Sequence, residues 1–440
     1  MMKPQLIKVL YCSHLLILVF GLSFATPAWT LTIDAAFDKA VKVDPGLRAS
    51  RFNQLATAEN IAIARSRLLP QIMLQGASNQ LTQTTTQDVP GGSSLSRSFT
   101  GPSVNHQFVI RQGLIRPKEM SALNIAELQT QYGDVKYLSD ISDLWLRVAY
   151  AYIDLLGAQQ LTEAYEKPLT NMLIAARQEK VRFEKGDGTK DAADEAESQY
   201  QQAKSTYAQA MQGLRAKQRS FELLTQIDPI QLKDLKLSLR PEPKLMEQDR
   251  EQVWQRVKEK SFELRLAVLQ EAMQKERLRM ARADHSPTLD AIAAWNIAKN
   301  DATSTQGYKY KNNQIGMQYS IPIFAGGGIS AAERQAAYIL EASLADGVAI
   351  AKKVEGEFGL VWSAFQGLVS KVDAGYVSIN SAKEQFKAAE LSYIHGVKTI
   401  LEVANADLSL SRRTADQVNA VVELQKYVAR LARQDFRIDR

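Results

Sequence analysis

Apolar residues recur along this chain with two different spacings, and each spacing predicts a different kind of element. Short stretches near 104–111, 288–297 and 314–321 alternate apolar and polar residues, which indicates β-strands. Two long stretches, 118–186 and 329–395, follow the helical period and contain a single proline, Pro168. Each would form a helix roughly 100 Å long at about 1.5 Å per residue.

The order of these features is duplicated at an offset of roughly 210 residues, which is typical of an internal repeat. Each half predicts a helix, two strands, a long helix and a half-length helix. The first half covers 31–228, a linker or equatorial segment follows at 229–247, and the second half covers 248–440. The anchors shared by the halves are Ala64, Arg65 and Pro70 against Ala281, Arg282 and Pro287, Gly113, Leu114 and Ile115 against Pro322, Ile323 and Phe324, and Phe183, Gly186 and Ala196 against Tyr393, Gly396 and Ala406.

The lengths of the predicted helices indicate how they are arranged. They are expected at about 189–227 and 248–283, and the first helix, 33–69, is expected to be interrupted near Asp44. Two half-length helices stacked end to end match one long helix, which favours a tunnel of even height over a compact bundle. Frequent alanine along these stretches permits close helix spacing. A long solvent-exposed coiled coil that acts as a spacer would share these features and stays an alternative.

The strand pattern predicts a sheet with one apolar and one polar face. Asp290 and Gln318 belong to the polar face, and the apolar face includes Phe108, Leu289, Trp295, Met317 and Tyr319. Such faces fit a membrane barrel with an apolar outside and a polar lumen, although a soluble sheet with one core face has the same period. The polar stretches 82–100 and 299–313 are predicted to be surface loops between the paired strands.

The N-terminal segment predicts export from the cytoplasm. Lys3 and Lys8 precede an apolar run that ends in small residues up to Ala28, which indicates a cleaved signal peptide over 1–28. Cys12, the one cysteine of the chain, lies inside this segment and follows the bulky Tyr11, so no lipid attachment is expected. Beyond it no run of about 18 apolar residues exists, so a membrane would have to be crossed by strands.

Composition and charge leave little room for catalysis or nucleic-acid binding. The 440 residues are 45% hydrophobic and 23% charged, with a formal net charge of +6. Basic residues are mixed with acidic ones, without the basic stripe typical of a nucleic-acid surface. His106, His285 and His395 have no neighbours at metal-ligand spacing. The three glycines at 326–328 lack the lysine that follows a phosphate loop, so a strand-to-helix turn, and no catalytic, cofactor or metal site, is expected.

Five short motifs, in order on the duplicated framework, make the chain resemble the TolC family of outer-membrane channel proteins over essentially its whole length after the signal segment. Each motif is weak alone, and their order gives the resemblance its specificity. The motifs are Ala64-Arg65-Ser66-Arg67-Leu68-Leu69-Pro70-Gln71, Ala149-Tyr150-Ala151-Tyr152-Ile153-Asp154-Leu155-Leu156, Arg182-Phe183-Glu184-Lys185-Gly186, Ile321-Pro322-Ile323-Phe324-Ala325-Gly326-Gly327 and Tyr393-Ile394-His395-Gly396-Val397-Lys398-Thr399-Ile400.

The resemblance implies a mixed α+β membrane protein in which three copies each give four strands to one twelve-stranded barrel, continued by an α-helical tunnel through the periplasm. Four strands cannot close a barrel, whereas two, three or four copies could, so the number three comes from the resemblance alone. The family's periplasmic end is closed by coiled helices that open when an adaptor and an inner-membrane transporter dock. The helix-tip turns that match this end are Gly186, Asp187, Gly188, His395 and Gly396.

The resemblance also implies a periplasmic gate. Tyr393 and Lys398 match the tyrosine and the basic residue that tie neighbouring coils together, and Glu402 and Asn405 match acidic positions that line the constriction. The expected acidic partner is displaced by one position, to Asp191. Lysine in place of arginine loses the planar bidentate fork, and asparagine in place of an acid thins the negative ring. Without the resemblance, Lys398 and Glu402 would be a surface pair worth about 0.3 kcal/mol.

Together these features predict an outer-membrane exit duct that passively conducts proteins or small molecules and catalyses no reaction. The expected partners are further copies of the chain, outer-membrane lipid, a periplasmic adaptor, and an ABC or proton-driven inner-membrane transporter. Because no lipid-accepting cysteine is expected, type I secretion is favoured over drug efflux. The alternative function is a periplasmic coiled-coil spacer or adaptor that has no barrel.

Overall fold

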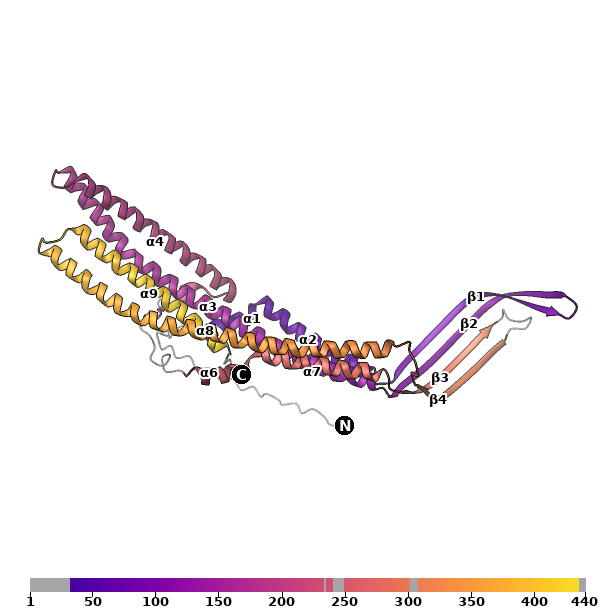
Figure 1. The fold of residues 1–440 in the computed structure, drawn as a ribbon. Coiled ribbons are helices and arrows are strands. Elements are labelled where there is room, and N and C mark those ends of the chain that lie inside the picture. Colours follow the sequence, from indigo (N-terminus) through magenta and orange to yellow (C-terminus); the bar gives the residue numbers. More distant parts are fainter. Residues whose placement is uncertain (1–31, 233–234, 240–248, 301–307, 435–440) are drawn as a thin grey trace, which may run out of the picture.

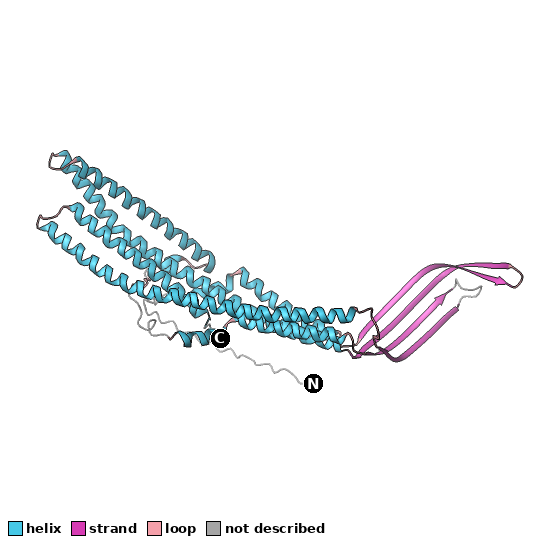
Figure 2. Cartoon of the chain, in the orientation of Figure 1, coloured by secondary structure: helices cyan, strands magenta, loops and turns pink. Residues whose placement is uncertain are grey.

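The computed structural model describes residues 32–232, 235–239, 249–300 and 308–434. The molecule is elongated, with a sheet at one end, two helical hairpins at the other and lengthwise helices between them (Figure 1). Figure 2 shows that strands and helices are segregated along this axis. The predicted combination of a small sheet with long helices is therefore confirmed, whereas the predicted signal peptide, 1–28, lies outside the described residues.

The sheet contains four antiparallel strands in the order β1-β2-β3-β4. Strands β2 and β3 are far apart in the sequence but pair directly, with Phe108 opposite Trp295. In the described part of the chain β1 and β4 each pair with one neighbour, so each leaves one edge uncovered. The strands are β1, Gln71–Val89, β2, Ser93–Ile115, β3, Thr288–Asn300, and β4, Tyr308–Ser320.

Residues 82–100, which were predicted to be a loop, form the outer parts of strands β1 and β2. β1 and β2 continue as a two-stranded ribbon, and only residues 90–92 form its turn. Threonine favours extended backbone because its side chain is β-branched, so a polar segment can form strand without apolar alternation. The prediction for 299–313 is also wrong where the chain is described, because β3 reaches Asn300 and β4 begins at Tyr308; residues 301–307 lie outside the described ranges.

Cross-strand hydroxyl pairs accompany the two-stranded ribbon on one of its faces. Thr82 and Thr100 lie 2.9 Å apart through their Oγ1 atoms. The next two pairs outward are Thr84 with Ser98, at 3.0 Å, and Thr86 with Ser96, at 3.3 Å. We call these six residues the hydroxyl ladder.

The first predicted helix is interrupted at Asp44, as expected. α1, Ile33–Val43, and α2, Pro45–Ser66, meet there. The Asp44 carboxylate accepts a hydrogen bond from the Leu47 backbone N–H at 2.6 Å, and proline in the first turn of α2 lacks only an N–H that the helix would leave unpaired.

The prediction of one helix over 248–283 is wrong, because the structure contains two. α6 is Arg250–Lys260 and α7 is Phe262–Ala283. Ser261 ends α6 and begins α7, since its Oγ accepts the Leu264 backbone N–H at 3.3 Å. A serine followed by an acidic residue in the next turn is an N-cap signal, so the sequence held the information.

The two long helices are confirmed at 68 residues for α3, Pro117–Glu184, and 67 residues for α8, Gly328–Ile394. Pro168 lies inside α3, where proline removes the hydrogen bond to the carbonyl four residues earlier. That carbonyl, of Ala164, accepts instead from the Ser411 hydroxyl of a neighbouring helix at 2.5 Å. The half-length partners are α4, Lys190–Thr225, and α9, Ile400–Gln434.

The segment between the two halves runs across the middle of the helices. It begins as a short 3₁₀ helix, η1, Pro229–Leu232. Gln160 of α3 donates to the Leu237 carbonyl at 3.0 Å, and Gln417 of α9 donates to the Leu239 carbonyl at 2.8 Å. These two glutamines hold the described part of the linker against both halves of the chain.

Candidate functional site

The two helical hairpins end in the same kind of turn at the end of the molecule that lies away from the sheet (Figure 1). Gly186 has φ 81° between α3 and α4, and Gly396 has φ 72° between α8 and α9. In each tip the residue after this glycine donates its N–H back into the last turn: Asp187 to the Arg182 carbonyl at 2.9 Å, and Val397 to the Ser392 carbonyl at 2.8 Å. Glycine fits because the left-handed backbone disfavours a Cβ.

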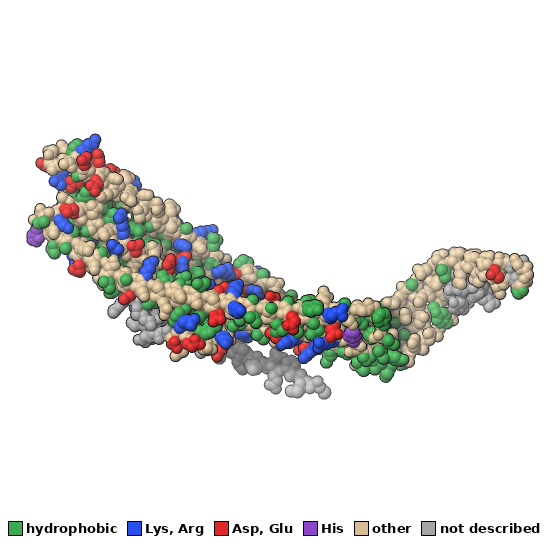
Figure 3. All heavy atoms as spheres, viewed as in Figure 1, with side chains coloured by type: hydrophobic (Ala, Val, Ile, Leu, Met, Phe, Trp, Pro, Cys, Tyr) green, Lys and Arg blue, Asp and Glu red, His purple; other side chains and the backbone are tan. Residues whose placement is uncertain are grey.

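The side chains around the two turns differ. The α3/α4 tip gathers charged side chains, whereas the visible α8/α9 tip has fewer of them (Figure 3). Large apolar residues are more exposed at the α8/α9 tip, where Leu391, Ile394 and Val397 are 57%, 73% and 78% exposed, than at the α3/α4 tip, where Val181 and Phe183 are 45% and 43% exposed. We call Leu391, Ile394 and Val397 the apolar tip. One backbone turn therefore presents two chemically different surfaces.

Among the residues predicted to form a gate, Tyr393 packs against a buried apolar cluster. Its side chain is half-buried and packs on a cluster formed by Phe386, Ala389 and Val403, which joins α8 to α9. Lys398 is exposed in the turn that follows. The tyrosine is thus positioned by packing, and the lysine can reach outward from the tip.

Glu402 has a structural task that sequence analysis missed. Its Oε2 accepts the Thr399 backbone N–H at 2.7 Å and the Thr399 hydroxyl at 3.1 Å. The Thr399 Oγ1 in turn accepts the Glu402 N–H at 3.3 Å. The bond from the Thr399 backbone N–H is the main cause that lowers the pKa of Glu402. This is a capping box at the start of α9, and the Thr-x-x-Glu spacing could have predicted it.

The remaining gate candidates are spread over both tips. Asn405 is half-buried one turn into α9, and Asp191 is exposed in the first turn of α4. Within the described part of this single chain, Tyr393, Lys398 and Asp191 form no hydrogen bond or ion pair with one another. One copy therefore brings Tyr393, Lys398, Glu402 and Asn405 to one tip and leaves Asp191 on the other.

A groove of about 620 Å³ lies beside the apolar tip, between α3, α8 and α9. Its charged lining residues are Lys387 and Glu390, both exposed on α8. Apolar side chains form most of the remaining lining, namely Ile174, Phe386, Leu391, Tyr393, Ile394, Ile400, Val403 and Ala404. An open apolar groove with charged residues beside it can accept a side chain or a helix from another protein.

A buried carboxyl joins the two hairpins above this groove. Asp407 of α9 is 4% exposed and accepts a hydrogen bond from the Asn171 amide of α3 at 2.6 Å. Burial is the main cause that raises its pKa, while the bond from Asn171 and the charge of Lys167 oppose the rise. No motif marked Asp407, because its partner lies on a helix distant in the sequence.

At the other end of the molecule the sheet separates apolar from polar side chains. Register places Phe108 opposite Trp295, Leu289 opposite Tyr319 and Ala291 opposite Met317. Directly opposite residues share a face, and Leu289, Ala291 and Trp295 are two or four residues apart, so all five predicted lipid-facing residues lie on one face of the sheet. Met317 is 73% and Tyr319 is 75% exposed. We call this surface the apolar face.

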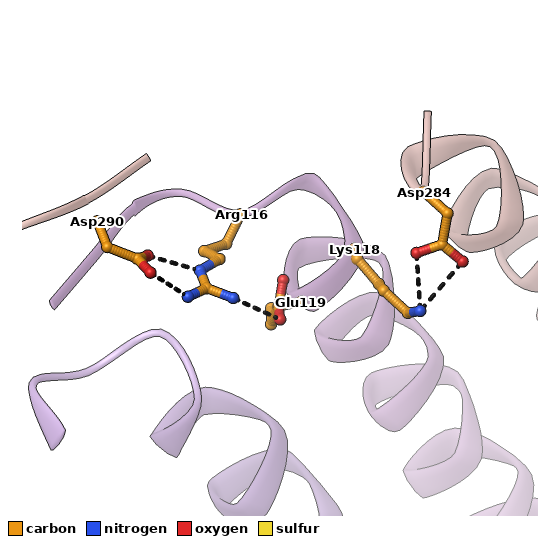
Figure 4. A network of polar contacts seen from close by, with 5 residues as sticks. All are labelled: Arg116, Lys118, Glu119, Asp284 and Asp290. Carbon is orange, nitrogen blue, oxygen red and sulfur yellow. Dashed lines mark hydrogen bonds and ion pairs between the residues drawn. The ribbon is translucent and has the colours of Figure 1, made fainter. Parts of the chain in front are cut away.

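A salt bridge ties the base of the sheet to the long helix (Figure 4). Arg116, at the start of α3, donates from Nε to Asp290 Oδ1 at 2.8 Å and from Nη2 to Oδ2 at 2.5 Å. Asp290 is only 7% exposed, so it belongs to this clamp and is not an open residue of the polar face. Gly113 lies opposite it, and a Cβ there would come within 2.7 Å of Arg116 Cγ.

None of the helices in the described ranges has an apolar stretch long enough to cross a bilayer. Among those same residues no three histidine, cysteine, aspartate or glutamate side chains are grouped as metal ligands would be. Of the histidines in the described ranges, His106 lies in β2, His285 follows α7 and His395 caps α8.

Comparison with known proteins identifies the family. The family described as outer membrane efflux protein matches residues 36–225 and 253–434. The chain belongs to this family. It is a TolC-type channel protein of the Gram-negative outer membrane that extends into the periplasm, and the resemblance seen in the sequence is confirmed.

Relatives of the outer membrane efflux protein family match the chain over most of its length. Outer membrane protein TolC of Vibrio cholerae is 23% identical over 429 residues, with 94% of each chain covered. Alkaline protease secretion protein AprF of Pseudomonas aeruginosa is 24% identical over 433 residues, with 95% of this chain and 89% of AprF covered. The CmeC outer membrane channel of Campylobacter jejuni has the same fold, with a TM-score of 0.73 at 15% identity over 93% of this chain and 87% of CmeC.

Proposed function

We propose that three copies of this chain form an outer-membrane exit duct that conducts cargo passively and catalyses no reaction. The observation that supports it most is the sheet, which has two uncovered edges, β1 and β4, and one exposed apolar face. Closed barrels of this kind have at least eight strands, so one chain cannot complete one. Pairing β4 of one copy with β1 of the next would remove every edge and cover the apolar face with lipid.

The helices fit the second part of the duct. α3 and α8, at 68 and 67 residues, would each reach about 100 Å from the barrel at 1.5 Å per residue. The half-length helices fill the space beside them. A spacer or adaptor without a barrel, the alternative function, would have no use for a four-stranded sheet with an exposed apolar face.

The gate, in this proposal, lies at the tips. Tyr393 and Lys398 would tie the α8/α9 tip of one copy to a neighbouring coil, with Asp191 as a candidate partner on the α3/α4 tip of the next copy. Glu402 and Asn405 would line the constriction, and the bond from the Thr399 N–H, which lowers the pKa of Glu402, extends its charged form to more acidic pH. The turns at 186–188 and 395–396, the apolar tip and the adjacent groove would receive a periplasmic adaptor.

The cargo is proposed to be protein, carried with an ABC transporter. AprF and the proteases secretion protein PrtF of Dickeya chrysanthemi are named for protease secretion, and both are about as similar to this chain as TolC is. Lipid attachment to a cysteine requires small residues just before it, whereas Cys12 follows the bulky Tyr11. The chain is therefore not expected to be lipidated, which favours the secretion type. Drug efflux with a proton-driven pump is the second candidate, because the family that matches the chain is described as outer membrane efflux protein.

Fractionation tests the duct directly. The processed chain is expected in the outer-membrane fraction as an oligomer that migrates intact in detergent gels until it is heated. Recovery in the soluble periplasmic fraction after gentle lysis would reject the barrel and favour the spacer. Co-expression with a protease-secreting ABC transporter and adaptor then distinguishes protein cargo from drug cargo. If the chain serves secretion, protease appears in the medium; if it serves efflux, cells gain only resistance to dyes.

A further inference from the structure

The outer end of the apolar face changes chemistry in a definite order. Leu289 and Tyr319 lie opposite each other at its base, and Lys299 and Lys309 lie opposite each other at its outer end. Lys311, opposite Ile297, lies two residues from Lys309 and so shares the same face. All three lysines are exposed. We call Lys299, Lys309 and Lys311 the lysine row.

The distance between base and lysine row matches the thickness of a membrane. The base pair and the outer pair are separated by ten residues, from 289 to 299, or about 33 Å of strand. A strand tilted by about 40° in a barrel would place them about 25 Å apart along the membrane normal, which is the height of the apolar band of outer-membrane barrels. The lysine row would therefore lie at the level of the outer lipid headgroups.

The charged residues of the described strands are distributed unevenly between the two faces of the sheet. The acidic side chains of the described strands are Asp88, near the far end of the ribbon, and Asp290, bound to Arg116 at the base. Neither lies beside the lysine row. The arginines of β2, Arg97 and Arg111, have odd numbers and so point to the face opposite His106 and Phe108. Among the described strands, the three lysines thus lie on the apolar face and the two arginines of β2 on the other.

Beyond the lysine row the same face becomes rich in hydroxyl groups. Val104 lies opposite Lys299, and the hydroxyl ladder begins four residues farther out, at Thr100 opposite Thr82. The ladder residues have even numbers, like Val104 and Phe108, and therefore continue the apolar face. The opposite face of the ribbon carries exposed Leu81 and Leu95 instead.

From the base outward, the face thus presents mainly apolar side chains, with Asn313 opposite Trp295 where the apolar run of β4 ends, then ammonium groups, then hydroxyl groups. We propose that this face is a docking surface for lipopolysaccharide of the outer leaflet, with the lysine row bound to its phosphate groups and the hydroxyl ladder level with its sugars. Acyl chains, phosphates and sugars follow one another in that glycolipid in the same order. The inference rests on the proposed barrel, which turns the apolar face toward lipid.

A charge-matched pair of variants tests the lysine row. One variant carries Lys299→Gln, Lys309→Gln and Lys311→Gln. The control carries Lys352→Gln, Lys371→Gln and Lys383→Gln, which removes three exposed lysines from α8. The purified detergent-solubilised oligomer is mixed with lipopolysaccharide, with the same lipopolysaccharide after removal of its lipid phosphates, and with phosphatidylglycerol, and bound lipid is counted by native mass spectrometry.

Wild type and control should bind intact lipopolysaccharide at least about tenfold more tightly than the dephosphorylated form, because each lysine near an anionic lipid surface contributes about 1 kcal/mol. The lysine-row variant should lose this preference. Equal binding by that variant, no preference in wild type, or phosphatidylglycerol binding as tight as lipopolysaccharide would each overturn the proposal. All proteins are first checked for the heat-resistant oligomer. Its absence in wild type would reject the proposed barrel. If the oligomer is intact but shows no preference for lipopolysaccharide, only the present inference is rejected.

Discussion

The sheet and the α8/α9 tip, at opposite ends of the molecule, both leave large apolar side chains uncovered, but in different patterns. Ile315 of the sheet is 82% exposed, and Ile394 and Val397 of the tip are 73% and 78% exposed. In the sheet such residues occupy alternate positions, as Tyr319, Met317 and Ile315 do on β4, whereas at the tip they are few and lie beside Lys387 and Glu390. A continuous apolar face suits lipid, and a small mixed patch suits a protein contact that must also separate.

The largest predicted effect is on assembly, and it comes from placing an arginine on the apolar face of the sheet and not on the polar face. Ala293 lies opposite Ile315 on the apolar face, and the adjacent Ala294 lies opposite Gln314 on the polar face. Ala293→Arg should cost about 2–4 kcal/mol per chain near the middle of the bilayer, because the charge enters hydrocarbon. Ala294→Arg should cost much less. The yield of heat-resistant oligomer in the outer membrane measures both.

The opposite ranking of these two variants would mean that the lipid-facing and lumen-facing sides have been exchanged. Asp290→Arg is not a suitable control, although Asp290 lies on the polar side. It would place two guanidinium groups together, because Asp290 binds Arg116 in the clamp.

A smaller effect is expected at the α8/α9 tip. Tyr393→Phe combined with Lys398→Ala should remove about 1–3 kcal/mol of linkage per chain if the contacts between copies are partly buried. The open form then becomes much more populated without a docked partner. Single-channel recordings in a planar bilayer should show larger and longer openings, with the heat-resistant oligomer unchanged.

Lys185→Ala removes one charge from the other tip and is the matched control, since Lys185 is exposed beside Gly186. It should leave conductance as in wild type. Unchanged conductance in a well-assembled Tyr393/Lys398 variant would show that these residues are ordinary surface residues.

The smallest effect concerns the capping box and depends on pH. The pKa of Glu402 is lowered in the folded chain, so its charged form stabilises the tip at pH above the unfolded value of about 4.3, and this stabilisation is lost as pH falls through the lower folded pKa. Glu402→Ala, which removes the acceptor, should therefore speed amide hydrogen exchange at the start of α9 at pH 7, and its difference from wild type should shrink as the pH falls through the lowered pKa of Glu402. The start of α4, with Ala192 in the equivalent position, should not change. Identical exchange at pH 7 would contradict the capping role.

Sequence predicted most of the fold where the pattern was local. The long helices followed from uninterrupted periodicity, and the break at Asp44 followed from a cap residue before proline. The ribbon at 82–100 was missed because both of its faces are largely polar in sequence, so no alternation marked it as strand. The break at Ser261 was missed although a serine cap was visible.

The sites were predictable to a smaller degree, because they depend on contacts between distant segments. The Arg116 and Asp290 clamp joins residues of different halves, and Asp407 meets Asn171 from another helix. Neither pair leaves a local signal. Glu402 shows the opposite case, since its capping partner is three residues away and the motif was readable. The gate residues and the lipid-facing side depend on contacts between copies of the chain, which no local sequence pattern encodes.

The mass of the particle extracted from the outer membrane tests the central claim most directly, because a four-stranded sheet can close a barrel only with other copies. Native mass spectrometry in a mild detergent should give one species with three copies of the processed chain, which heating converts to single chains. A single-copy particle, or recovery of the chain outside the membrane fraction, would contradict the barrel.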